Sequence, residues 1–217
     1  MTQNFDEKTI EQYVSEEVDC LPMVCNISLE EKFILDDLDE RYLFINDEID
    51  SAVAEHITYH IIRFNKEDKG LARKERKPIL IFICTPGGSV SDGFRIIDSI
   101  QASSTPIYTV NTGYWYSIGL LIGMAGDKRY GTKNSSYLMH DGHLGSFNST
   151  SKVIDEMKFY DALEYRIKEY TLTNTSISDD AYQSHSRIEW YMFSEEAKSM
   201  GVIDEIINED IKFEDLL

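Results

Sequence analysis

The chain has 217 residues, of which 42% are hydrophobic, and this is enough for one domain of ordinary size with a core of its own. Asp and Glu outnumber Lys and Arg by 39 to 21, which gives a formal net charge of -18. Such a charge repels phosphate backbones and argues against nucleic-acid binding; we interpret it as a source of solubility, with an acidic compartment or docking face as the alternative.

The beginning of the chain is acidic and only weakly periodic, so we predict an N-terminal arm over 1–37 and one domain over 38–217. It has no apolar segment of the secretory kind, and no stretch reaches the roughly 18 apolar residues that a membrane helix needs. Cys20, Cys25 and Cys84 form no C-x-x-C pair and have no histidine nearby in sequence. We therefore expect a cytoplasmic protein with no membrane segment, no bound metal and no cofactor.

The first predicted elements of the domain are a strand at 43–45 and a helix at 51–65, whose apolar residues repeat with helical spacing. His56 and His60 lie four residues apart on that helix, which is the spacing of a metal-binding pair. Because no third ligand is near in sequence, we favour two polar residues beside an apolar stripe. The charged segment 65–77 predicts a solvated connection, with a docking element as the alternative.

From residue 78 onward, apolar strands and helices alternate along the chain. This alternation predicts βαβ units and a mostly parallel sheet. The long helix that begins at 150 either packs beside the core or projects into a neighbouring subunit. We expect strands at 78–84, 106–112, 137–140 and 202–207, and helices at about 94–100, 117–125, 150–171, after Ser178 and at 194–200.

Three loops carry residues of the kinds that enzymes use in catalysis. Gly87 and Gly88 follow a buried strand, and N–H groups at such a turn can hold a developing oxyanion, although an ordinary tight turn is the alternative. Ser117 opens a helix, where serines usually act as caps, but the positive end of a helix also favours a nucleophilic oxygen. His140 ends an apolar strand; a lone histidine is usually structural, yet this edge is where α/β sites form.

Four segments of the chain match a known family in order and spacing: TPGGSVSDGFRIIDSIQ, GYWYSIG, DKRYGTKNSSYLMH and FSEEAKSMGVIDEII. Together they resemble the proteolytic subunit of Clp proteases, from about Leu38 to Ile207. The resemblance implies an α/β fold of the ClpP and crotonase type, built of repeated ββα and βαβ units. It also implies a projecting handle helix at about 148–174, through which two rings meet.

The resemblance assigns catalytic roles to the three loops. It makes Ser117 the nucleophile and His140 the general base. It forms the oxyanion hole from the N–H of Ile118 together with that of Gly87 or Gly88.

A glutamate, Glu189, falls where the family has the aspartate that orients the histidine. Glutamate fills this role in triads on other folds, although its extra methylene changes the reach, and a surface acid is the alternative. The strand after the histidine matches the segment that pairs with substrate peptide. The residues that the resemblance places against substrate are Ser89, Gly142, Leu144 and Gly145.

The chain departs from the family pattern beside each catalytic residue. Trp115 and Tyr116 replace two small residues, so their rings narrow the site or fill a pocket. Ile188 replaces an arginine that couples ring contacts to the order of the triad. Asp141 and Gly142 replace Gln-Pro, and Asp141 is a poor substitute for the third acid because strand neighbours point to opposite faces.

The leading hypothesis is a serine endopeptidase subunit of a self-compartmentalised protease, assembled into rings as a stacked double heptamer. A separate AAA+ unfoldase delivers unfolded polypeptides, because the chain has no G-x-x-x-x-G-K-[ST] loop of its own. The second hypothesis is a catalytically impaired docking subunit paired with an active ClpP paralogue. The third is an acyl-CoA enzyme of the crotonase type, against which the Ser117 and His140 pair argues.

Overall fold

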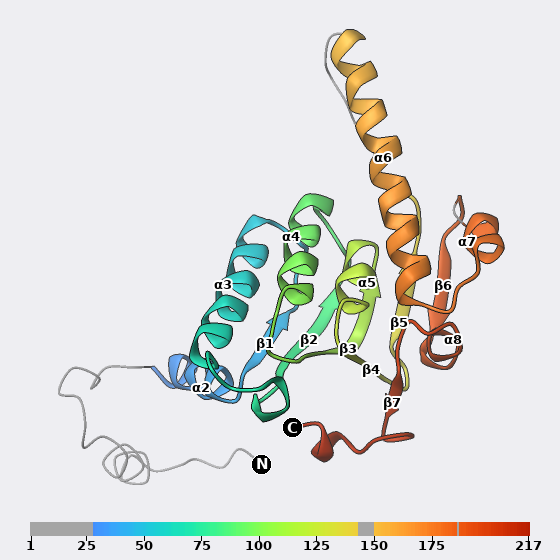
Figure 1. The fold of residues 1–217 in the computed structure, drawn as a ribbon. Helices are drawn as coiled ribbons and strands as arrows, with labels where there is room; N and C mark the ends of the chain where they lie inside the picture. Colours follow the sequence, from blue (N-terminus) through green and yellow to red (C-terminus); the bar gives the residue numbers. More distant parts are fainter. Residues whose placement is uncertain (1–27, 143–149, 186) are drawn as a thin grey trace, which may run out of the picture. The chain divides into compact units, whose positions relative to one another are not determined.

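The computed structural model describes residues 28–142, 150–185 and 187–217 (Figure 1). The chain divides into two units, 1–40 and 41–217. In the first unit, α2 (Leu29–Asp39) begins at a capping box, in which Ser28 and Glu31 each accept a hydrogen bond from the other's backbone N–H. Most of the predicted arm lies outside the described residues, and its boundary after residue 37 stays a prediction.

The second unit is built on a seven-stranded sheet. Its strand order is β1-β2-β3-β4-β7, and β5 pairs with both β3 and β6. Every pairing is parallel except that of β5 with β6. The mostly parallel sheet predicted from the alternation of strands and helices is therefore confirmed. The strands are β1 (Tyr42–Ile45), β2 (Ile79–Thr85), β3 (Ile107–Tyr116), β4 (Lys128–Thr132), β5 (Ser136–Met139), β6 (Trp190–Phe193) and β7 (Glu205–Ile207).

Three helices cover one face of the sheet: α3 (Ser51–Glu67), α4 (Val90–Gln101) and α5 (Ile118–Gly123) (Figure 1). Successive side chains of a strand point to opposite faces, so a strand covered on both faces is apolar throughout. In β2, Ile79, Ile81 and Ile83 are fully buried, and the intervening Leu80 and Phe82 are also buried. The unbroken apolar run in the sequence thus reflects two cores, one on each side.

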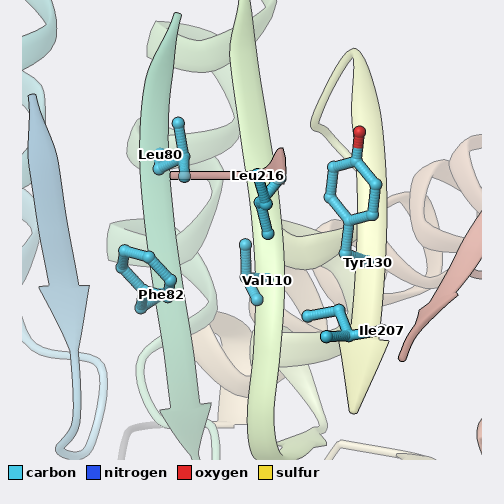
Figure 2. Packing of buried hydrophobic residues seen from close by; sticks show 6 residues of the cluster. All are labelled: Leu80, Phe82, Val110, Tyr130, Ile207 and Leu216. Atoms are coloured by element: carbon cyan, nitrogen blue, oxygen red, sulfur yellow. The ribbon is translucent and has the colours of Figure 1, made fainter. Parts of the chain in front are cut away.

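The core on the other face is a cluster that the C-terminal segment helps to cover (Figure 2). Leu216, just after the short 3-10 helix η2 (Phe213–Asp215), packs into it and is 8% exposed. The segment is also fixed by a hydrogen bond of 3.0 Å from the Tyr42 hydroxyl to the carbonyl of Leu217. The cluster consists of Leu80, Phe82, Val110, Tyr130, Ile207 and Leu216.

The long helix α6 (Thr150–Asn174) extends well beyond the sheet (Figure 1). Its C-terminal end packs against the core: Thr171 is fully buried, and the Tyr170 hydroxyl donates a hydrogen bond of 3.1 Å to the carbonyl of Leu121 in α5. Its outer part carries exposed apolar residues such as Ile154 and Phe159. The remaining helices are α7 (Asp179–His185), α8 (Ser194–Ser199) and the 3-10 helix η1 (Arg73–Glu75).

The segment 65–77 is mostly exposed, as its charges predicted, with one buried exception. α3 continues to Glu67, and the next residue, Asp68, is only 3% exposed. Arg41 donates two hydrogen bonds of 2.7 Å to Asp68, and Thr105 donates a third. Hydrogen bonding to Arg41 lowers the pKa of the Asp68 carboxyl. The prediction fails only at this residue, because a charge in a charged run can be buried when its partner comes from a distant segment.

Candidate active site

Ser117 lies at a strained turn between β3 and α5. Its backbone angles are φ 54° and ψ -127°, in a region that residues other than glycine rarely adopt. Its N–H donates a hydrogen bond of 3.0 Å to the carbonyl of Leu138 in β5. Among the described residues, its side chain makes no capping hydrogen bond, so a capping role does not explain the serine. A strained turn between a strand and a helix also exposes the nucleophile in the α/β-hydrolase fold.

The glycine turn packs directly against this serine. Gly87 has a φ of 101°, and a Cβ placed on it would lie 2.7 Å from the Cβ of Ser117. Only a glycine at that position allows the two turns to approach each other so closely. The turn that follows β2 and the turn that follows β3 therefore form one edge of the site.

The N–H groups of Gly87 and Gly88 differ in their partners. The N–H of Gly87 is directed to the hydroxyl of Thr85 at 3.2 Å. Gly88 forms a parallel bridge with Ile49. In this bridge Ile49 donates a hydrogen bond to the carbonyl of Gly87 and accepts one from the N–H of Ser89, so that Gly88 itself takes no part in either bond. Within the described part of the chain, neither the N–H of Gly88 nor that of Ile118 has a backbone acceptor.

His140 and Glu189 are brought together by the antiparallel pairing of β5 and β6. The last registered pair is Met139 with Trp190, so His140 and Glu189 face each other one residue further along. The Nδ1 of His140 lies 3.7 Å from the Oε1 of Glu189, an ion-pair distance longer than a hydrogen bond. The side chain of His140 is 18% exposed and that of Glu189 is 56% exposed.

Two hollows meet at the histidine. A small pocket of about 50 Å³ is lined by Ser117, Ile118, His140 and Gly142 and closed by apolar side chains of α5 and α6. A larger cavity of about 660 Å³ is also lined by His140 and Gly142, and it extends between α6 and α7. The structure thus places the predicted nucleophile, base and oxyanion donor around one pocket, with room for a ligand beside it.

Other predicted residues have structural roles or lie elsewhere. Ser89 accepts a hydrogen bond of 3.3 Å from the N–H of Asp92 and caps α4. Leu144 and Gly145 lie outside the described residues. Ile188, which replaces the arginine, is 55% exposed.

The two bulky residues before the serine have opposite environments. Trp115 is fully buried and donates a hydrogen bond of 3.2 Å from its ring nitrogen to the carbonyl of Ile83. Of the two alternatives for this ring, it fills a space in the core and does not narrow the site. Tyr116 is half-buried, and its hydroxyl shares a hydrogen bond of 2.9 Å with Ser136.

Sequence reasoning missed Tyr191, whose hydroxyl donates a hydrogen bond of 2.6 Å to the Oε2 of Glu189. This bond raises the pKa of the Tyr191 phenol, because the carboxylate favours the protonated form. The signal that finds it is the spacing of Glu189 and Tyr191, since residues two apart in a strand share a face. That signal requires β6 to be recognised as a strand.

The described residues show no group of three His, Cys, Asp or Glu side chains placed to hold a metal ion. The rings of His56 and His60 contact each other, with centroids 4.6 Å apart, and His60 is 8% exposed. No helix in the described ranges has the length and apolar character needed to cross a membrane.

Comparison with known proteins gives one family. The family model described as "Clp protease" matches residues 30–210. "ATP-dependent Clp protease proteolytic subunit 3" of Synechococcus sp. (strain CC9605) is 31% identical over 177 residues, covering 78% of this chain and 83% of that protein. "ATP-dependent Clp protease proteolytic subunit 2" of Tropheryma whipplei (strain Twist) is 29% identical, covering 79% and 93%.

A solved structure shares the fold. A ClpP1 mutant from Listeria monocytogenes superimposes with a TM-score of 0.72 at 24% sequence identity, covering 85% of this chain and 99% of that one. The α/β fold of the ClpP type, which the resemblance implied, is confirmed by this match, and so is the resemblance itself. The chain therefore belongs to the Clp protease family and is a Clp-type protease subunit.

Proposed function

We propose that this subunit hydrolyses peptide bonds with Ser117 as nucleophile, His140 as general base and Glu189 as the acid that orients the imidazole. The observation that carries the proposal is the shared pocket: Ser117 and His140 line it together, and Glu189 lies 3.7 Å behind the histidine. Hydrogen bonds of a catalytic set are often long without substrate and tighten in the complex. A distance of 3.7 Å is compatible with that behaviour.

In the mechanism, the Oγ of Ser117 attacks the carbonyl carbon of the scissile bond while His140 accepts the serine proton. The tetrahedral intermediate collapses, the C–N bond breaks, and His140 returns the proton to the leaving amine. Water then attacks the acyl-enzyme with the same histidine as base, which releases the acid product and restores Ser117.

The developing oxyanion is held by two backbone N–H groups, those of Gly88 and Ile118. They lie on the two turns that meet at Ser117, and neither has a backbone acceptor in the described part of the chain. Gly87, the other candidate, directs its N–H to Thr85 and serves instead to let the turns approach. Donors of this kind, fixed in advance, typically contribute about 10²- to 10³-fold to the rate.

The substrate is an unfolded polypeptide that lies along the edge after β5. Gly142 lines both hollows and is exposed there, so a peptide backbone can approach it closely. On the family pattern we also assign substrate contacts to Ser89, at the start of α4, and to Leu144 and Gly145, which lie outside the described residues. The larger cavity beside His140 supplies the room for side chains of the substrate.

The assembly that we propose is a ring of subunits, stacked as a double heptamer in the cytoplasm. The outer part of α6, with its exposed apolar residues, is the surface offered to the second ring. The curated relatives are named ATP-dependent, and no Walker-type loop occurs in this sequence. Nucleotide hydrolysis is therefore assigned to a separate AAA+ unfoldase.

A docking subunit with impaired catalysis, paired with an active ClpP paralogue, is the second candidate. It is favoured by the exposure of Glu189 and by the large ring of Tyr116 next to the nucleophile. The first departure weakens the orienting acid, and the second changes the surroundings of the serine. Folding and ring assembly require neither an orienting acid nor an active serine.

The test is labelling of the assembled full-length protein with a fluorophosphonate probe, followed by peptide mapping. We expect covalent modification at Ser117, no labelling of Ser117→Ala, and unchanged labelling of Ser91→Ala, an exposed serine on α4. Hydrolysis of a fluorogenic peptide should be lost in the same variant. A wild-type protein that is not labelled, alone or with its paralogue, would support the docking subunit instead.

A further inference from the structure

The residues around the proposed acid share one face of the sheet. In the registers of β3, β5 and β6, Tyr116 lies beside Leu138, and Leu138 lies beside Tyr191. Because side chains of a strand alternate between faces, His140 lies on the face of Leu138, and Glu189 lies on the face of Tyr191. All five side chains therefore occupy the same side of this part of the sheet.

Contacts connect four of these side chains, those of Tyr116, Tyr191, Glu189 and His140, in a continuous series. Tyr191 donates a hydrogen bond of 2.6 Å to the Oε2 of Glu189, whose Oε1 lies 3.7 Å from His140. The edge of the Tyr191 ring packs against Tyr116, with centroids 5.9 Å apart and planes at 85°. Tyr116 is itself fixed by its hydrogen bond of 2.9 Å with Ser136.

This series addresses a weakness of the proposed triad. Glu189 is more than half exposed and has three rotatable side-chain bonds, so by itself it would spend little time facing the histidine. A phenol that donates to one carboxylate oxygen restricts the side chain while leaving the other oxygen directed at His140. Hydrogen bonds to ionised acceptors are the strong ones, and this one is short.

We propose that Tyr191 is a positioning residue that holds the carboxylate of Glu189 against the Nδ1 of His140, with Tyr116 as its support. The inference rests on the proposed function, because it gives Tyr191 a role in the same reaction. It connects two departures from the family pattern, the glutamate and the bulky residue before the serine, into one arrangement. The raised pKa of the Tyr191 phenol fits a hydroxyl that stays protonated and donating at neutral pH.

The kinetic test compares Tyr191→Phe with the assembled wild-type protein in the hydrolysis of a fluorogenic peptide. We expect kcat to fall about tenfold with KM almost unchanged, since a small misplacement of a catalytic group slows chemistry more than binding. Tyr59→Phe, which removes a hydroxyl from an exposed tyrosine on α3, is the matched control and should behave as wild type. A Tyr191→Phe enzyme with wild-type kcat would overturn the proposal.

A double-mutant cycle separates positioning from a general structural effect. In the Glu189→Gln background, Tyr191→Phe should have no further effect on kcat, because the carboxylate that it positions is already gone. Two effects that multiply would show that Tyr191 acts independently of Glu189, and would overturn the proposal. If Ser117→Ala hydrolyses the peptide as well as wild type, it is the proposed function that fails.

A second readout requires no activity. With ¹³C-labelled tyrosine, the Tyr191 resonance is identified by its loss in Tyr191→Phe, and its titration is followed by NMR in the Ser117→Ala background. Tyr191 should ionise at a higher pH when Glu189 is present than in Glu189→Gln. Equal titration curves would mean that the hydrogen bond is not formed in solution, and the proposal would then fail whatever the kinetics.

Discussion

The two faces of the segment made by β3, β5 and β6 have similar aromatic content but opposite properties. On one face, Trp115, Tyr137 and Trp190 are buried, and the first two rings pack edge to face with centroids 5.5 Å apart. On the other face, Tyr116 is half-buried, and Tyr191 is exposed and hydrogen-bonded to Glu189. Aromatic side chains thus pack the core from one side and organise polar groups from the other.

The difference teaches that burial of a ring, and not its size, decides which task it performs. Trp115 and Tyr116 are neighbours in sequence, yet a change in the first should alter stability and a change in the second should alter the site. The following substitutions test that division, from the largest expected effect on stability or on the activation barrier to the smallest.

The largest effect is expected from Trp115→Ala. The side chain is fully buried and packs against Gly123, where a Cβ would lie 2.3 Å from the ring. Removing it leaves a cavity in the core and should lower the free energy of unfolding by about 3–5 kcal/mol, as measured by urea denaturation. A loss below about 1 kcal/mol would contradict a core role for this ring.

Glu189→Gln should act on the reaction and leave the fold intact. Loss of the carboxylate behind His140 is expected to reduce kcat roughly 10²- to 10³-fold, with the free energy of unfolding nearly unchanged because the side chain is exposed. Steady-state kinetics and urea denaturation of the same preparation measure both. Hydrolysis at the wild-type rate would show that Glu189 is a surface acid.

Tyr137 predicts a pH dependence that belongs to the buried face. Burial raises the pKa of its phenol to about 12, so the folded state keeps the proton while the unfolded state, with a pKa of about 10, loses it. The stability is therefore complete below about pH 10 and declines as the pH rises toward 12, by up to about 2–3 kcal/mol. Tyr137→Phe should reduce this decline in denaturation experiments between pH 9 and 12, and an unchanged slope would contradict the assignment.

Tyr116→Phe should have the smallest effect. It removes the hydrogen bond with Ser136 and keeps the ring that packs against Tyr191. The unfolding free energy should fall by no more than about 1 kcal/mol, and kcat should fall less than in Tyr191→Phe. A larger kinetic effect than that of Tyr191→Phe would give Tyr116 the primary role and would make Tyr191 its support.

Sequence patterns predicted the elements whose burial is regular. β2 could be read from a continuous apolar run, and α7 from Ser178, which accepts the N–H of Ala181 at 3.2 Å. β4 (Lys128–Thr132) was missed because its sequence, KRYGT, is mostly polar and has no apolar periodicity. Asp68 was placed in a solvated loop because nothing local indicates that Arg41 will reach it.

The candidate site was predictable where the chemistry lies in local motifs. Ser117 and the glycine turn have their own sequence signals, and the family resemblance located Glu189. Tyr191 could not be predicted in the same way, because its role depends on the antiparallel register of β6 with β5 and on a strand of four residues. The burial of Trp115 also depended on the strand register, since alternation alone does not say whether Trp115 or Tyr116 faces the core.

The bridge between Ile49 and Gly88 has a consequence for the energy of reaction. Both neighbours of Gly88 are hydrogen-bonded to Ile49, at 2.7 Å and 2.8 Å, so the direction of the Gly88 N–H is set when the domain folds. Water must reorient around a forming negative charge, whereas a dipole fixed in this way does not. The reorganisation energy at this proposed oxyanion donor is thus met during folding, and Ile49→Pro, which removes the backbone N–H that bonds to Gly87, would return part of it to the chemical step.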